Sequence, residues 1–455
     1  MNAQRTSTLA RHLTTTSATL FGLSYMTPIV VCATLGLITE KAHGAAAISY
    51  LVATAAMLLT AHSYSVFARR YSSAGSAYTY LSESVHPNVG FMVGWALILD
   101  YCFIPTVIVL LTSISLSTLW PTVPSWIWVT GLALLSTILN ALGIRITDRV
   151  NLAIMGLQLA MVAVLGGLCI HHILIRDGAL GLFDTASQSI HVSIPAVFAG
   201  SAIACYSFLG FDAVSTLSEE TRDPTRSIPR AIMIATAAGG FLFTTLAYLM
   251  LRAHPMLDFK NVDTAAYEIV ATVGGDSFRT LFMLVLTVSF FAAALCAHAG
   301  GARLLYAMGR QGVLPRTLFG VLSPRTATPV VGIAFIGVAM LGAEFLTASA
   351  STSYINFGAF SAFLAVNAGV VLEYRRQCWN EQPINVAAAV AAAAGAVVCV
   401  FLLVSLDTRA LMLGVAWLTC GAAWLLALTR GLSRPLPRLF TPDGPAPVKP
   451  VATPR

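Results

Sequence analysis

Two carboxylates stand in the middle of long apolar stretches of this 455-residue chain. Asp212 follows a glycine flanked by aromatic residues in the apolar run 194–217, and Asp100 lies at a similar depth in residues 88–117. A charged side chain at the centre of a bilayer costs roughly 3 kcal/mol or more, so such residues usually serve a function. The alternative is structural: Gly210 would be a packing contact, and Asp212 would bond to a neighbouring helix.

The residues around these carboxylates favour a cationic ligand. Ammonium groups bind carboxylates through charge-assisted hydrogen bonds and aromatic faces through cation–π contacts, and the carbonyls of an unwound helix add further acceptors. Only His298 is placed to offset the two negative charges within the predicted membrane helices. The residues expected to bind one or two ammonium groups are Tyr25, Thr27, Asp100, Tyr101, Tyr206, Phe208, Gly210, Phe211 and Asp212.

His298 has two interpretations. Histidine titrates near neutral pH and could carry a coupled proton, but it could equally bond a helix carbonyl and pack. Two buried carboxylates disfavour each other's charged forms, so a diammonium substrate would displace a proton from the pair. Proton symport would then need a second group that is charged in the loaded state, and His298 is the candidate.

The composition places the chain in a membrane. It is 57% hydrophobic and only 10% charged, which excludes a soluble globular protein. Twenty lysines and arginines fall in segments predicted to be cytoplasmic and six in outer segments, which predicts cytoplasmic N- and C-termini in the cell inner (plasma) membrane. The net charge of +7 therefore reflects topology and does not indicate nucleic acid. Seven of the eight cysteines lie in apolar spans, which favours packing over a metal site or disulfides.

Apolar stretches of about 20 residues predict an all-α integral membrane protein with twelve transmembrane helices. These helices are expected near residues 15–38, 44–67, 88–117, 124–143, 149–172, 194–217, 229–251, 277–307, 328–345, 351–374, 385–405 and 409–430. The whole chain, 1–455, is interpreted as one transporter domain. Its proline-rich tail, 431–455, is expected to be disordered.

The first and sixth helices carry matching interruptions. Gly210 weakens the sixth helix, and the segment from Gly22 through Ser24 to Pro28 should kink or unwind the first. Five spans separate the two helices, so they enter the membrane from opposite sides, as an inverted five-plus-five repeat requires. Repeat one would cover about 15–172, repeat two about 194–374, and two extra helices about 385–430. Paired interruptions of this kind point to the substrate site.

Two inner segments and one helix residue have expected structural roles. Residues 75–80 are interpreted as part of a polar cytoplasmic loop. The charged residues after the sixth helix are expected to form an inner ion-pair network, and they are Glu219, Glu220, Arg222, Asp223, Arg226 and Arg230. Asn356 is expected to form a hydrogen bond between helices.

The motifs resemble those of the amino acid–polyamine–organocation permeases, and most of all the bacterial putrescine-importer branch. Residues 207–214 and 217–221 carry the most specific part of this resemblance, and residues 75–80, 90–101, 303–310 and 355–359 also match. The resemblance covers most of residues 15–430. It implies a leucine-transporter-type fold and inward transport of a polyamine with protons.

Two departures from the family pattern are visible. Residues 24–28 replace the Gly-Ser-Gly turn with which many amino acid permeases hold a substrate carboxylate, and this fits a substrate without one. The fifth helix has no lysine, although some proton-coupled relatives place one there, so the coupling ion is unassigned.

The sequence therefore predicts a secondary transporter that imports putrescine or a related polyamine, by proton symport. A cationic or neutral amino acid permease or exchanger of the same superfamily is the alternative. A dication gains roughly 4.6 kcal/mol from a 100 mV inside-negative potential, so uniport also stays open. No repeated filter residues indicate a channel. No nucleophile–base pair or metal-ligand spacing indicates an enzyme, a cofactor or a metal site.

Overall fold

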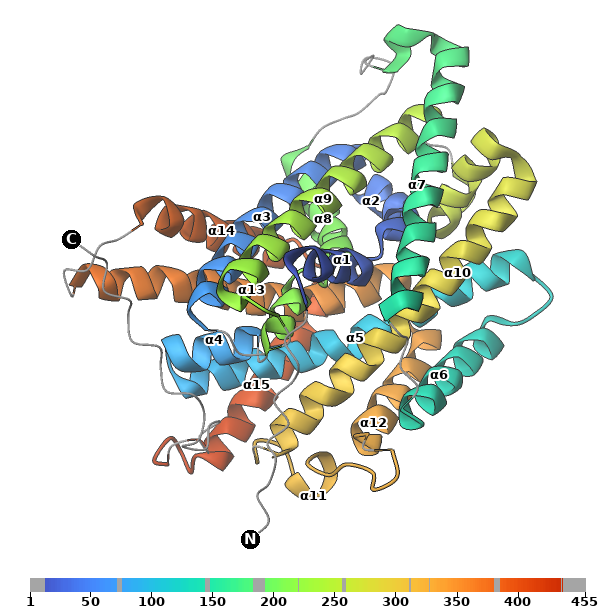
Figure 1. Ribbon diagram of the computed structural model, residues 1–455. Helices are drawn as coiled ribbons and strands as arrows, with labels where there is room; N and C mark the ends of the chain where they lie inside the picture. The colour runs from blue at the N-terminus through green and yellow to red at the C-terminus, as the bar shows by residue number, and fades with distance from the viewer. Residues whose placement is uncertain are drawn as a thin grey trace.

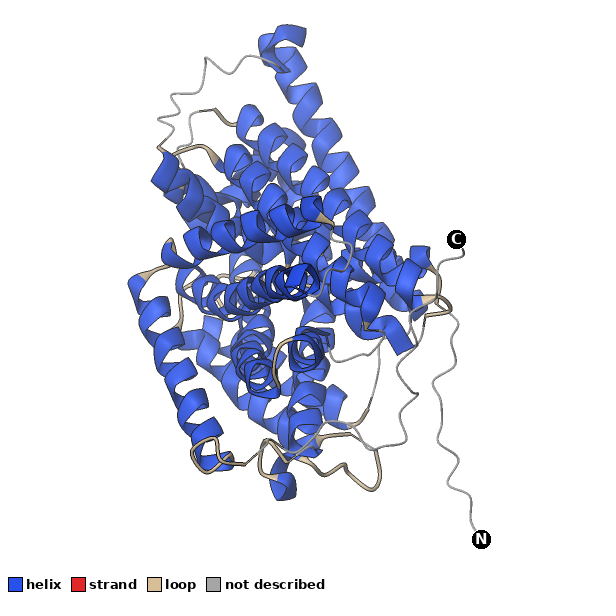
Figure 2. Cartoon of the chain, turned by 90° about the vertical axis from the view of Figure 1, so that its left-hand side faces the viewer, coloured by secondary structure: helices blue, strands red, loops and turns tan. Residues whose placement is uncertain are grey.

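The computed structural model describes residues 13–71, 76–143, 148–182, 193–219, 221–255, 259–310, 312–326, 328–379, 385–434 and 436. These residues form helices packed side by side, and no strand occurs among them (Figures 1 and 2). The predicted disordered tail lies outside the described residues except for 431–434 and 436.

The first half of the chain contains eight α-helices and four short 3₁₀ helices within the described ranges. They are α1 (Thr15–Met26), η1 (Pro28–Val30), α2 (Val31–Lys41), α3 (Ala46–Arg70), α4 (Ser76–Ser84), α5 (Pro87–Leu119), α6 (Ser125–Ala141), α7 (Asp148–Asp177), η2 (Ala179–Leu182), α8 (Ile194–Ala204), η3 (Cys205–Phe208) and η4 (Asp212–Glu219).

The second half of the chain also consists of α-helices and short 3₁₀ helices within the described ranges. Its described elements are α9 (Pro224–Ala253), η5 (Val262–Thr264), α10 (Ala265–Arg310), α11 (Arg316–Phe319), α12 (Val330–Leu341), η6 (Gly342–Phe345), α13 (Ala348–Trp379), α14 (Val386–Val404) and α15 (Thr408–Leu428).

Ten of the described helical segments are long and apolar enough to cross a membrane. They are Thr15–Lys41, Ala46–Arg70, Pro87–Leu119, Leu152–Asp177, Ile194–Ser218, Pro224–Ala253, Val262–Arg310, Ala348–Cys378, Val386–Val404 and Thr408–Leu428. Two shorter apolar helices, Ser125–Ala141 and Val330–Phe345, coincide with the fourth and ninth predicted helices. The protein is thus an all-helical, multi-pass membrane protein.

The interrupted helices lie at the centre of this bundle. In the most apolar 18-residue stretch of the segment Thr15–Lys41, 89% of the residues are buried, whereas the corresponding fractions are 28% in α14 and 17% in α15. The first helix packs against α9 and α8 packs against α3, whereas Figure 1 shows α14 and α15 towards the edge of the molecule. Backbone groups freed by the interruptions are therefore surrounded by protein, where other helices can satisfy them.

Both predicted interruptions are confirmed. The first helix stops at Met26, and Thr27 takes a left-handed conformation (φ 52°) before Pro28 starts η1. The sixth predicted helix divides into α8, η3 and η4, with Gly210 at φ 116° between the two 3₁₀ segments. Proline has no N–H to donate, and a glycine reaches positive φ without steric cost, so each break follows from its local sequence.

The prediction of a polar loop at residues 75–80 is wrong for its described part, since residue 75 lies outside the described ranges. Residues 76–84 form α4, in which Tyr80 is fully buried and stacks on Phe67 with ring centroids 5.6 Å apart. The ring of Tyr78 packs on Gly94 of α5. Only nine residues long and rich in serine and tyrosine, this helix lacks the apolar run on which the sequence prediction relied.

The predicted ion-pair network after the sixth helix is only weakly represented. Asp223 and Arg226 approach to 3.9 Å, but their side chains are 53% and 79% exposed, so this pair contributes little. Glu220 and the side chain of Glu219 lie outside the described part. A different ion pair joins α3 to α13, between Arg70 and Glu373.

Candidate substrate-binding site

The break in the sixth helix brings the first helix against its backbone. A Cβ atom at residue 210 would lie 2.3 Å from Cδ1 of Tyr25, so the tyrosine ring packs directly on the glycine. Gly22 has a similar role, because a Cβ there would lie 2.6 Å from Val214 in η4. Glycine at these positions lets the two interrupted helices meet closely, and this contact fixes where Tyr25 stands.

Asp212 begins η4 directly after this break. Its side chain is buried, and Oδ1 accepts a hydrogen bond of 3.3 Å from the N–H of Gly210. The carboxylate therefore stays beside the unwound segment. The backbone N–H groups of Asp212 itself and of Ala213 also interact with the carboxylate, and a carboxylate can accept about four hydrogen bonds, so capacity for a ligand remains.

Asp100 lies on α5 and is also buried, with a relative exposure of 4%. Its Oδ1 has no hydrogen-bond partner among the described residues, and the carboxyl group interacts electrostatically with that of Asp212. The backbone of Asp100 packs against α13, where a Cβ at Gly358 would lie 3.0 Å from the Asp100 nitrogen. An unpartnered buried carboxylate oxygen requires an explanation, and a cationic ligand would supply one.

Two tyrosine hydroxyls complete this polar region. The hydroxyl oxygens of Tyr25 and Tyr64 are buried and have no partner among the described residues. The Tyr25 ring packs on Gly210 and the Tyr64 ring packs edge-on against Phe211, so both residues lie beside the break that precedes Asp212. A buried unsatisfied polar group costs about 1–3 kcal/mol, so several around one pair of carboxylates favour a site that a ligand fills.

Tyr101 lies beside the pair on α5, and its backbone carbonyl is a further acceptor. Pro105, four residues later in the same helix, has no N–H to donate to that carbonyl. The same region of Tyr101 faces α10, where a Cβ at Gly301 would lie 3.0 Å from the carbonyl oxygen.

A small cavity of about 50 Å³ adjoins these groups, between the first helix, α5, α7, η3 and α10. Tyr25, Thr27 and Tyr206 of the predicted set line it, whereas Asp100 and Asp212 do not. Tyr25 lines the cavity and also packs on Gly210, whose N–H binds Asp212, so it links the cavity to this carboxylate.

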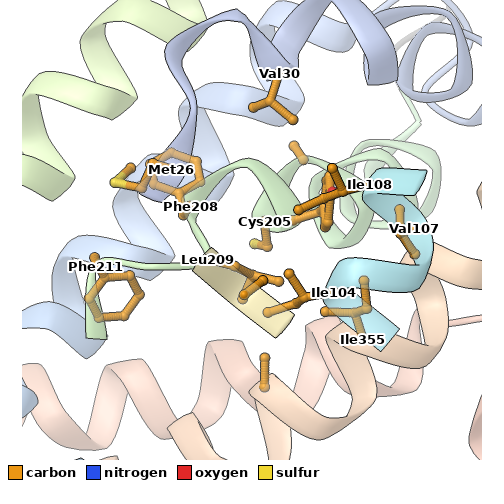
Figure 3. Close-up of a cluster of buried hydrophobic side chains, with 14 of the residues drawn as sticks. Met26, Val30, Ile104, Val107, Ile108, Cys205, Phe208, Leu209, Phe211 and Ile355 are labelled. Atoms are coloured by element: carbon orange, nitrogen blue, oxygen red, sulfur yellow. The ribbon is translucent and has the colours of Figure 1, made fainter. Parts of the chain in front are cut away.

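Phe208 and Phe211 do not line this cavity, and both are fully buried in the protein core. Figure 3 shows them with Leu209 in a cluster that also contains Met26 of α1 and Ile104 of α5. Phe208 packs edge-on against Phe243 of α9 (5.2 Å), and the Phe211 ring lies 5.6 Å from that of Tyr64. These contacts hold the unwound segment in place. Direct contact of the two phenylalanines with substrate stays a prediction.

His298 links three helices. Its Nδ1 lies 3.0 Å from the hydroxyl of Ser136 on α6, and its Nε2 lies 2.8 Å from the carbonyl oxygen of Ile333 on α12. These contacts agree with the alternative interpretation, in which His298 bonds a helix carbonyl and packs between helices. A serine hydroxyl can donate to the neutral ring or accept from the charged ring, so the same geometry serves a protonated histidine. The proton-coupling role stays a prediction.

Asn356 forms the predicted interhelical bond, because its Nδ2 donates to the carbonyl of Ala202 on α8.

The sequence analysis missed two residues of the site region, Tyr64 and Gln158. Gln158 is the only amide in the apolar stretch 152–170 and could have been found from that isolation. Tyr64 offered no such signal, because its orientation depends on how α3 packs.

Comparison with known proteins identifies the family. A sequence model of the amino acid permease family matches residues 13–418. The chain belongs to this family of amino acid permeases. This permease is 36% identical to the low-affinity putrescine importer PlaP of Escherichia coli K12 over 441 residues, which cover 94% of this chain and 96% of that protein.

Other relatives of this permease are named for different substrates. The vacuolar cationic amino acid transporter 4 of Arabidopsis thaliana is 30% identical over 362 residues, covering 74% of this chain and 58% of its own length. The branched-chain amino acid permease BcaP of Bacillus subtilis is 26% identical over 398 residues, covering 81% and 82%. The family and these relatives are transporters, so the protein is a permease and not an enzyme.

Proposed function

We propose that this permease imports putrescine or a related polyamine across the cell inner (plasma) membrane by proton symport. The observation that carries the proposal is the buried pair Asp100 and Asp212, with which no described lysine or arginine forms an ion pair. Buried charges are normally paired, and an ammonium group would supply the missing partner. The similarity to a putrescine importer over nearly the full length supports the same substrate class.

The proposed architecture is one transporter domain with twelve transmembrane helices, an inverted five-plus-five repeat, two extra helices and both termini in the cytoplasm. The twelve apolar helices and the interruptions in the first and sixth support it, as does the excess of basic residues in the predicted inner segments.

An amino acid substrate is the second candidate, because two relatives of this permease are named as amino acid transporters. An amino acid carries a carboxylate, which needs donors at the break of the first helix. Uptake competition between putrescine, lysine, arginine and leucine separates the two functions. We expect putrescine to compete at much lower concentration than any of the amino acids, and strong competition by an amino acid alone would overturn polyamine import.

Putrescine uptake into proteoliposomes with the pH gradient and the membrane potential imposed independently tests the coupling. Uptake that responds to an inward proton gradient at zero potential supports symport. Uptake that follows the potential alone contradicts symport, because an inside-negative potential of 100 mV already contributes roughly 4.6 kcal/mol to a dication.

The His298→Gln variant tests the proposed proton carrier. We expect it to weaken uptake driven by a pH gradient at least about tenfold while sparing uptake driven by potential, because glutamine keeps hydrogen bonding but cannot take up a proton. The control is His171→Gln, since His171 is exposed on α7. Intact gradient-driven uptake by the His298 variant would remove this residue from the coupling.

A further inference from the structure

Gln158 is a buried polar side chain without a described partner for its carbonyl oxygen. Only 2% of the residue is exposed, and Oε1 has no hydrogen-bond partner among the described residues. The side chain lines the cavity beside Tyr25 and Thr27. Leaving such an oxygen unpaired in an apolar surrounding costs free energy, so its position at a cavity points to a donor that binds there.

The rest of the cavity is built for an organic cation of low polarity. The rings of Phe21, Tyr25, Tyr206 and Phe290 belong to its lining, and its other side chains are mainly aliphatic. No lysine, arginine or carboxylate lines it among the described residues. Aromatic faces and one amide oxygen can hold an ammonium group, whereas a substrate carboxylate would need donors.

Tyr25 connects this cavity to Asp212, because its side chain lines the cavity and its ring packs on Gly210, whose N–H donates to the Asp212 carboxylate. The cavity of about 50 Å³ has room for one end of a small molecule only. We propose that it receives the second amino group of a diamine whose first amino group binds at the carboxylates, and that Oε1 of Gln158 accepts a hydrogen bond from it. Gln158 then selects diamines over monoamines, an assignment that rests on the proposed import of polyamines.

A structural role for Gln158 predicts something different. The helix α7 packs against α1 and η1, so the amide could instead brace the break in the first helix. If Gln158 only stabilised this break, its loss would weaken the binding of every amine to a similar degree. Both the carboxylates and the cavity depend on the conformation of the first helix at the break.

The test compares dissociation constants of putrescine and butylamine, which share a four-carbon chain and differ in one terminal amino group. Ligand-dependent thermal stabilisation of the purified full-length protein gives both constants. In Gln158→Met, which keeps the length of the side chain but lacks the amide oxygen, we expect putrescine to bind about 10- to 100-fold more weakly, with butylamine changed less than about twofold. Gln158→Glu retains an oxygen acceptor and should keep or increase the preference for putrescine.

Leu157→Met is the matched control, because Leu157 is 46% exposed on the same helix and should leave both constants unchanged. Equal weakening of both amines by Gln158→Met, or no weakening of either, overturns the inference while leaving polyamine import intact. Failure of the unmodified protein to bind putrescine, with tight binding of an amino acid, overturns the proposed function and the inference with it.

Discussion

Replacing Asp212 with asparagine is expected to abolish high-affinity amine uptake while the protein accumulates in the membrane at a normal level. Asparagine keeps the oxygen that accepts the hydrogen bond from Gly210, so the variant removes the charge and spares the local backbone contact. Truncating one partner of a buried charge pair costs about 2–5 kcal/mol, which corresponds to a loss of affinity of about 30- to 5,000-fold. Putrescine binding and initial uptake rates measure the effect.

Asp276→Asn is the matched control for this change. Its carboxylate is 82% exposed and pairs with Arg279 on α10, so its loss should alter uptake little. Uptake by Asp212→Asn equal to that of the unmodified protein would remove this carboxylate from the site. Loss of the protein from the membrane would favour the structural interpretation, in which Asp212 only stabilises the start of η4.

The helices and their interruptions were predictable because their causes are local. A long apolar stretch has few alternatives to a membrane helix, and Pro28 and Gly210 act on the backbone at their own positions. The short helix α4 was missed because its stability depends on tertiary burial of Tyr80, which no local pattern reveals. The first turns of α10, at residues 265–274, were missed because Gly275, a glycine of positive φ, separates them from the main apolar run.

The site was predictable only where a residue is rare in its surroundings. A carboxylate within an apolar helix is such a residue, and both Asp100 and Asp212 are buried in the structure, whereas their contact with substrate stays a prediction. Which aromatic rings face the cavity depends on helix rotation and packing. Sequence therefore could not distinguish Tyr25, which lines the cavity, from Phe208, which packs on α9.

Tyr25 occupies the position on which the proposed substrate path depends. Its ring lies on the backbone of Gly210, whose N–H donates to Asp212, and the same ring lines the cavity with Gln158. A change at residue 210 should consequently act on the cavity and on the carboxylate pair together, although Gly210 itself has no side chain.

Replacing Gly210 with alanine is expected to lower putrescine uptake at least about tenfold and to reduce thermal stability. The native φ of 116° is unfavourable for any residue with a Cβ atom and costs about 1–3 kcal/mol. The new methyl group would also lie 2.3 Å from the ring of Tyr25 and displace it. Uptake in proteoliposomes and the melting temperature of the purified protein measure the two effects.

The control is Gly167→Ala in α7, where a Cβ atom meets nothing within 4 Å and both measurements should stay close to those of the unmodified protein. The double variant Gly210→Ala with Tyr25→Ala separates steric displacement from loss of function. Removing the ring makes room for the methyl group, so part of the lost stability should return. Uptake should stay low, because the aromatic wall between the cavity and the carboxylates is then absent. Normal uptake by Gly210→Ala alone would contradict the requirement for an unwound sixth helix at this residue.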